Sequence, residues 1–142
     1  MAGINTRKVW IGGLAGGVVW IVWATIVNFV FLMPKYMAAR EVGTMLKDPR
    51  YPFFMAVWVL QFLVLGVLVA ALYAAVRASW GPGPGTAVKV GLIAGGFAGF
   101  PVNFYNSAWA TFPRIIPFGW LLELLVGAVL AALVAGWLYR DA

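Results

Sequence analysis

The residues of this chain that could do chemistry inside a membrane are few. They are one acid, four amides and one hydroxyl, all within long apolar segments: Glu123, Asn28, Asn103, Asn106, Gln61 and Ser107. A carboxylate in hydrocarbon is costly unless it is protonated, paired or hydrated. Such a set can hold a proton, a cation or a polar molecule, or it can join helices through hydrogen bonds.

The residues that most enzymes and metal sites depend on are missing. The chain has no His and no Cys, which are the usual ligands of zinc, copper, haem and iron–sulfur clusters. Ser107 has no base within one helical turn, and a single intramembrane acid offers no acid–base pair. We therefore expect no enzyme activity, no cofactor and no metal.

The composition requires a lipid environment. Of 142 residues, 64% are hydrophobic and 10% are charged, with a mean hydropathy of +0.95, more apolar surface than a soluble domain can hide. The apolar segments 9–33, 52–77, 88–112 and 117–139 are each long enough to cross a bilayer. The sequence predicts one all-α integral membrane domain, residues 1–142, with four transmembrane helices in a bundle.

The polar residues fall in one half of the membrane. The odd spans run from the side of the N-terminus (side A) to the opposite side (side B), and the even spans return. At a rise of about 1.5 Å per residue, Asn28, Glu123 and Asn106 lie about 9 to 10 Å from the side B end, and Gln61 and Asn103 about 14 to 15 Å. One interpretation is a polar cavity open to side B, with Glu123 as a proton or cation site. The alternative, which we favour from the sequence, is a structural cluster in which the amides bridge helices.

Small residues on two spans form faces for close helix packing. The third span carries a glycine ridge at every fourth residue, which continues into Asn103 and Ser107, and the first span carries two interleaved G-x-x-x-G pairs. The residues of these faces are Gly12, Gly13, Gly16, Gly17, Gly91, Gly95 and Gly99. Helices approach closely at such residues in bilayers. We expect packing within one subunit, with a contact between subunits as the alternative.

Prolines divide the chain into its spans. We expect Pro34 to end the first span and Pro101 to kink the third. If residues 35–47 form a helix, their apolar side chains fall on one side and their polar side chains on the other. This pattern predicts an amphipathic helix lying in the membrane interface. The alternative is a solvated linker.

The two halves of the chain resemble each other. Residues 15–17 with 34–35 match 94–96 with 113–114 at one constant offset, and residues 66–75 resemble 127–136. We predict two duplicated helical hairpins related by a pseudo-twofold axis along the membrane normal.

The basic residues sit at the ends of the spans. The net charge of +6 therefore reflects anchoring to lipid headgroups rather than nucleic-acid binding. Five basic residues fall on each side, so the positive-inside rule does not decide the orientation. The distribution of acids favours termini in the cytoplasm.

Three features together resemble a known family. These are the Trp-rich first span with its Pro34-Lys35 exit, Asn106-Ser107 in the third span, and the last span rich in Gly and Ala. They resemble, in outline along the whole chain, the uncharacterised four-span bacterial membrane proteins of the domain-of-unknown-function family 1761. The resemblance implies a four-helix fold in a bacterial cytoplasmic membrane, and no activity.

Two functions are compatible with these features. Glycine faces, eight Trp and no catalytic group favour a non-catalytic subunit or homo-oligomeric packing module, whose partners would be other membrane subunits or further copies of itself. The alternative is a small homo-oligomeric transporter or channel for a small polar or cationic ligand. Its pathway would open on side B, pass Glu123, Asn103, Asn106 and Asn28, and narrow near Gln61.

Overall fold

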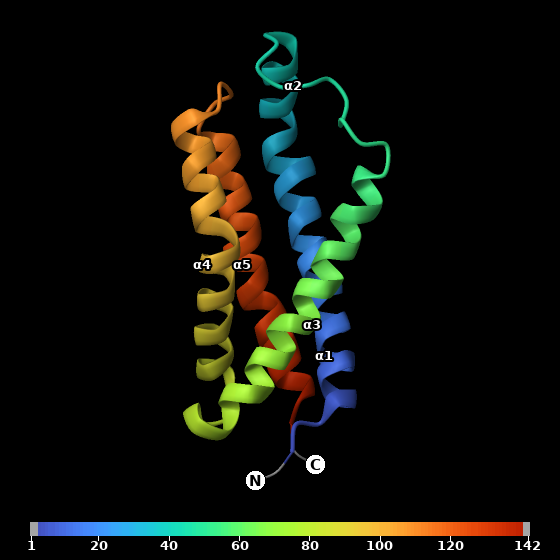
Figure 1. Ribbon diagram of the computed structural model, residues 1–142, viewed down its shortest axis with the longest axis vertical. Helices are drawn as coiled ribbons and strands as arrows, with labels where there is room; N and C mark the ends of the chain where they lie inside the picture. The colour runs from blue at the N-terminus through green and yellow to red at the C-terminus, as the bar shows by residue number, and fades with distance from the viewer. Residues whose placement is uncertain (1–2, 141–142) are drawn as a thin grey trace.

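Four long helices make up the structure, a computed structural model that describes residues 3–140. The elements in chain order are α1 (Thr6–Thr25), a π-helical segment η1 (Ile26–Leu32), α2 (Met33–Glu41), α3 (Phe54–Trp80), α4 (Pro84–Trp109) and α5 (Ile115–Leu138). The segment α1–η1–α2 is one continuous rod of 36 residues, and the other three helices have 27, 26 and 24. The two ends of the chain lie together (Figure 1). The predicted all-α fold with four membrane-spanning helices is confirmed.

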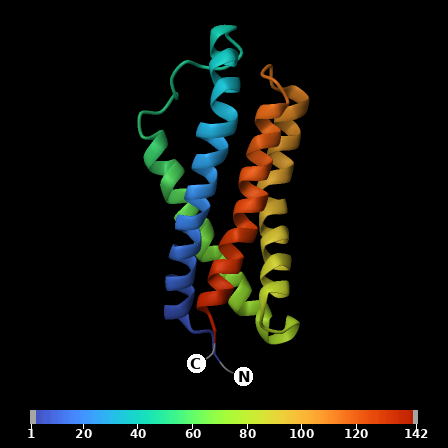
Figure 2. The ribbon, with the colours of Figure 1, turned by 180° about the vertical axis from the view of Figure 1, so that it is seen from behind.

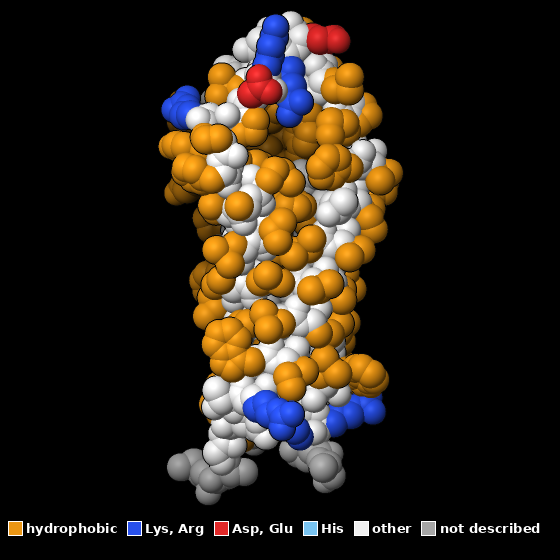
Figure 3. Space-filling model, turned by 90° about the vertical axis from the view of Figure 1, so that its right-hand side faces the viewer, with side chains coloured by type: hydrophobic (Ala, Val, Ile, Leu, Met, Phe, Trp, Pro, Cys, Tyr) orange, Lys and Arg blue, Asp and Glu red, His pale blue; other side chains and the backbone are white. Residues whose placement is uncertain are grey.

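The surface is divided as a membrane requires. On the face shown in Figure 3, apolar side chains cover the middle of the molecule, Lys and Arg side chains lie at both ends, and acidic side chains lie at the upper end, side B. Each helix is about 36 Å long or more, compared with about 30 Å for the hydrocarbon core of a bilayer. All four can therefore cross it.

The first span differs from the prediction at Pro34. Pro34 has no N–H, so the α-helical bond to the carbonyl of Val30 cannot form, yet the helix does not end there. It passes through the wider π-helical turn η1 and continues to Glu41. α2 prolongs the axis of α1 (Figure 1), and residues 42–53 form an irregular connection. The predicted helix at 35–47 lying in the membrane plane is therefore wrong.

The glycines of α1 bring it against two helices at once. A methyl group at Gly13 would lie 2.5 Å from Cα of Val67 in α3, and one at Gly16 would lie 2.7 Å from the carbonyl oxygen of Ala131 in α5. Gly17 likewise faces α3. The predicted packing face is thus occupied within one chain, as expected.

The ridge on α4 packs along α5. Gly91, Gly95, Gly99 and Asn103 are all buried, and a methyl group at Gly95 would lie 2.7 Å from Cα of Leu125. Pro101 lies inside α4, which continues past it to Trp109.

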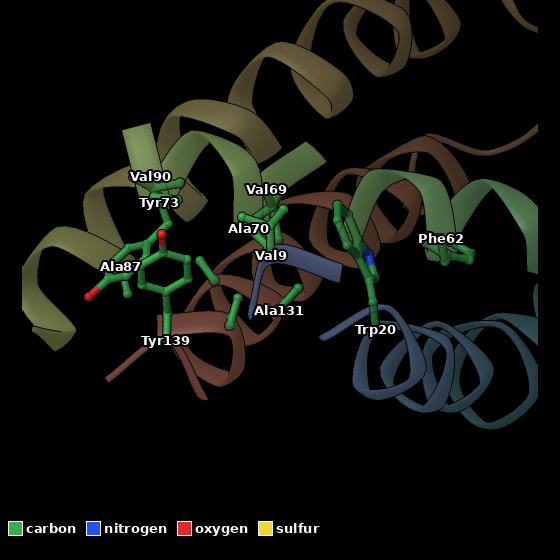
Figure 4. Close-up of a cluster of buried hydrophobic side chains, with 14 of the residues drawn as sticks. Val9, Trp20, Phe62, Val69, Ala70, Tyr73, Ala87, Val90, Ala131 and Tyr139 are labelled. Atoms are coloured by element: carbon green, nitrogen blue, oxygen red, sulfur yellow. The ribbon is translucent and has the colours of Figure 1, made fainter. Parts of the chain in front are cut away.

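The core fills the middle and the side A half of the bundle. It joins residues of α1, α3, α4 and α5 (Figure 4). Near its side B limit, Trp20 and Phe62 are 1% and 0% exposed, with ring centroids 5.5 Å apart. Tyr73 and Tyr139 meet edge to face at the side A end.

The helix α3 is tilted relative to the other three. It lies near α4 at the lower, side A end and diverges from it towards side B (Figures 1 and 2), whereas α4 and α5 stay side by side along their length. This tilt sets the shape of the site described below. The internal duplication stays a prediction.

Candidate functional site

A cavity of about 620 Å³ occupies the side B half of the molecule, where α3 diverges. Its walls come from η1, α2, α3, α4 and α5, and the connection 42–53 covers its outer end. It opens towards the bilayer beside α3, because Phe54, Met55 and Gln61 of its wall are exposed. The surface is visibly hollowed just below the charged upper end (Figure 3).

Five of the six predicted polar residues line this cavity: Asn28, Gln61, Asn103, Asn106 and Glu123. They come from four different helices. Counting residues from the ends of the spans had placed them in the same half of the membrane, and the fold brings them together in one cavity. Ser107 is not among the lining residues, and its hydroxyl donates to the carbonyl of Phe104 in its own helix (2.8 Å).

Glu123 is a buried acid without an ion pair. It is 5% exposed, and no Lys or Arg nitrogen of residues 3–140 lies within 4.0 Å of its carboxylate. α5 begins at Ile115, eight residues earlier, whereas the favourable charge of a helix N-terminus is confined to the first turn. The partial charge of this N-terminus therefore does not stabilise Glu123. Asn28 and Trp58 lie beside the carboxyl group and can donate hydrogen bonds to it, but no described basic side chain neutralises a negative charge there.

A chain of hydrogen bonds connects α5, α2 and η1 at the cavity wall. The indole Nε1 of Trp120 donates to the hydroxyl of Tyr36 (2.6 Å), and this hydroxyl donates to Oδ1 of Asn28 (2.5 Å). The amide Nδ2 of Asn28 donates to the carbonyl of Ala24 (2.8 Å). An amide nitrogen carries two hydrogens, so a second donor of Asn28 remains for Glu123, which lies beside it.

The π-helical turn contributes to this arrangement. Asn28 lies inside η1, and its side chain occupies the carbonyl four residues back, the acceptor that an α-helix reserves for the backbone N–H. π-Helical turns are rare and occur frequently at functional sites. Pro34, which has no N–H to bond the carbonyl of Val30, follows two residues after this turn.

Asn103 does not bridge two helices, as the structural alternative expected. Its Nδ2 donates to the carbonyl of Gly99 in the same helix (2.8 Å). Its other side faces the cavity together with Asn106. The amides of α4 are therefore better described as cavity lining than as links between helices.

Trp20 is not among the residues that line the cavity, but it lies next to the inner end, against the backbone of Glu123. Its indole Nε1 donates to the backbone carbonyl of Glu123 (3.0 Å) and lies directly over Gly127, where a methyl group would overlap the ring. Phe62 packs against Trp20 and, edge to face at 5.3 Å, against Trp58. The sequence predicted that the pathway narrows near Gln61. The rings of Trp58 and Phe62 lie within one helical turn of Gln61 on α3.

Three aromatic residues that line the cavity, Tyr36, Trp58 and Trp120, were not identified from the sequence. Neither was the hydrogen bond from Trp20 to α5. The available signal for Tyr36 was its spacing of eight residues from Asn28 on a continuous helix, which the expected break at Pro34 concealed.

The side chains that line the cavity have groups that can bind a ligand. Among residues 3–140, no group of three or more His, Cys, Asp or Glu could hold a metal ion. One acid, several amides and aromatic rings can hold a proton or cation and hydrogen-bond a small molecule.

Comparison with known proteins adds no relative. No family model, no curated protein and no solved structure matches the chain. The resemblance to the domain-of-unknown-function family 1761 stays a prediction, and the function has to be argued from the cavity.

Proposed function

We propose that the chain is a small, non-catalytic membrane transporter that binds a small polar or cationic molecule in the side B cavity. The observation that carries this proposal is Glu123, a carboxyl group 5% exposed, without an ion pair, at the inner end of a space of about 620 Å³. Ionisable groups inside membranes are costly and mark pathways for ions, protons or substrates.

The dimensions and lining of the cavity support a small ligand. Ligand sites of about 300 to 1,000 Å³ are typically apolar with a few polar groups that set orientation. Here the polar groups at the inner end are the carboxyl of Glu123 and the amides around it, and the other charged side chains lie only towards the connection 42–53. Met and aromatic side chains make up most of the remaining wall.

A second hollow supports passage across the membrane. About 570 Å³ of space lies at the side A end, between the loop after α3 and the end of α5, next to Tyr73 and Arg77. The buried core, with Trp20 and Phe62 at its upper limit, separates the two hollows. Transport would require a conformation in which this barrier opens to side A while the side B cavity closes.

A second candidate function is that of a subunit in an assembly. The glycine faces that favoured it are covered by helices of the same chain. The observation that now favours it is Gln61, an exposed amide in the middle of α3 beside the open flank of the cavity. A second copy or another subunit packed on α3 would cover the flank and satisfy this amide.

Cysteine accessibility tests the proposal, because the chain contains no Cys and each single substitution reports alone. Asn106→Cys faces the cavity, and Tyr105→Cys, one residue earlier and 63% exposed, faces lipid. Gln61→Cys and Leu60→Cys form a second pair on α3. In sealed vesicles, a membrane-impermeant thiol reagent should modify the cavity member of each pair from side B and from side B only, because thiolates form in water. Equal labelling within both pairs, or labelling of neither cavity position, would refute a water-filled cavity.

The same variants separate the two functions. Disulfide crosslinking of Gln61→Cys between copies in the membrane would show that α3 lies at an interface. Labelling without crosslinking favours a transporter that works as a single chain.

A further inference from the structure

The inner end of the cavity combines a carboxyl group with aromatic rings. Glu123 lies beside Trp58 of α3, and Trp120 lies one turn earlier on α5 in the same wall. Indole faces attract cations through the ring quadrupole, and a carboxylate attracts them through its charge. Both features select the same sign of ligand charge.

These rings are fixed before any ligand binds. Trp58 meets Phe62 edge to face at 5.3 Å, and Trp120 meets Phe112 edge to face at 5.6 Å. Trp120 is also tied to Tyr36 by its indole N–H. A rigid aromatic site loses little entropy when a ligand binds.

The outer part of the cavity is apolar on one side and carries both signs of charge on the other. Met33 and Met55 contribute flexible apolar surface, whereas Arg40, Asp48 and Arg50 lie towards the connection 42–53. The two Arg and Asp48 are nearer to side B, so the inner end retains only the negative charge of Glu123. A ligand with a positive charge and an apolar body matches this arrangement of charged and apolar groups.

We propose that the cavity binds organic cations with a bulky apolar body, such as quaternary or protonated amines, with the positive centre between Glu123, Trp58 and Trp120. This inference rests on the proposed function, because it names the class of molecule that the cavity would take. The open flank beside α3 lets such an amphipathic molecule enter from the side B leaflet as well as from water.

Two probes of nearly equal shape and opposite charge test the sign of the site. Tetraphenylphosphonium is a cation with an apolar body, and tetraphenylborate is its anionic counterpart. Binding to the purified full chain in detergent is measured by equilibrium dialysis. Both probes also partition into the detergent micelles, so the same measurement on Glu123→Gln is used to separate this partitioning from binding at Glu123. We expect saturable binding of the cation that weakens at least about tenfold in Glu123→Gln, and for the anion no difference between the two proteins.

A tryptophan pair tests the aromatic part. Trp58→Leu should weaken binding of the cation about two- to thirtyfold, the range of a cation–π contact. Trp10→Leu, which removes a lipid-facing indole 55% exposed on α1, should leave it unchanged. Helix content and unfolding midpoint, measured on each variant, show whether lost binding reflects a lost fold.

The outcomes separate this inference from the function on which it rests. If Asn106→Cys is labelled from side B but the cation does not bind, or binds Glu123→Gln equally well, the cavity stands and the ligand class is wrong. Binding of the anion that depends on Glu123 in the same way would also overturn the inference. If neither Asn106→Cys nor Gln61→Cys is labelled, the cavity itself is refuted, and the ligand class with it.

Discussion

Replacing Gly127 with alanine tests whether Trp20 is seated on α5 as the barrier below the cavity. In the structure, the missing side chain of Gly127 is the space that the indole occupies, and the indole N–H reaches the carbonyl of Glu123 from there. A methyl group would overlap Nε1 and Cδ1 of the ring. The ring must therefore move, and its hydrogen bond must break.

The magnitude follows from two contributions. Forcing an extra methyl group into a packed core costs about 1 to 3 kcal/mol, and a lost hydrogen bond between membrane helices costs about 0.6 to 2 kcal/mol. The gain in helix propensity from Gly to Ala, about 0.5 to 1 kcal/mol, opposes these terms. Gly96→Ala is the matched control, since nothing lies within 4 Å of its new methyl group and only the propensity gain applies. We expect Gly127→Ala to be less stable than Gly96→Ala by about 2 to 5 kcal/mol.

The assay is reversible unfolding in mixed micelles with increasing sodium dodecyl sulfate. Unfolding is followed by the far-ultraviolet circular dichroism of the helices. A double-mutant cycle identifies the cause: in a Trp20→Ala background the penalty of Gly127→Ala should disappear, because the clashing ring is gone. Equal stability of Gly127→Ala and Gly96→Ala would refute the seating of Trp20. A penalty that persists without Trp20 would assign it to another contact.

Three further substitutions test the walls of the cavity. Tyr36→Phe breaks the hydrogen-bond chain to Asn28 and should lower the free energy of unfolding by about 1 kcal/mol, whereas Tyr105→Phe at the lipid face should not change it; equal effects would contradict the chain. Pro34→Ala restores the missing N–H, so the π-helical turn should relax into an α-helix and move residue 28 away from the cavity. Labelling of Asn28→Cys from side B should therefore fall when Pro34→Ala is added. Unchanged labelling would show that Pro34 does not determine the position of residue 28. Asn103→Ala removes only a bond within its own helix and should cost no more than about 1 kcal/mol; a much larger loss in the same unfolding assay would show that Asn103 joins two helices after all.

The arrangement of the helices was largely predictable, because hydropathy and glycine spacing determine it locally. Gly13, Gly16 and Gly95 leave room for backbone only, and each meets a neighbouring helix within 3 Å of where a methyl group would stand. What remained open was which helix each glycine meets. Spacing alone shows that a face is narrow but does not identify its partner.

Pro34 shows where local rules fail. The missing N–H predicts a break, but the residues that follow it gain burial by continuing the rod: Tyr36 and Ala39 are 8% and 2% exposed in a cluster with Ile116 of α5. This gain, together with the π-helical turn that absorbs the lost bond, outweighs the cost of the proline. The balance depends on tertiary contacts that one segment of sequence does not reveal.

The cavity was predictable in depth but not in direction. Counting residues from the span ends gave the level of Asn28, Asn106 and Glu123, because the rise of a helix is constant. The rotation of each helix about its axis and the tilt of α3 decide which aromatic rings face inward. For that reason Trp58 and Trp120 went unrecognised as part of the site.

The central claim is that the cavity is filled from side B as far as Glu123. The most direct measurement is an experimental structure in a lipid nanodisc at a resolution that reveals ordered water. The account predicts water or ligand density beside the carboxyl of Glu123, bounded by Asn28 and Asn106, with Trp20 next to the side A end. A dry site, with α3 packed onto α4 and the carboxyl of Glu123 fully paired with protein groups, would contradict it.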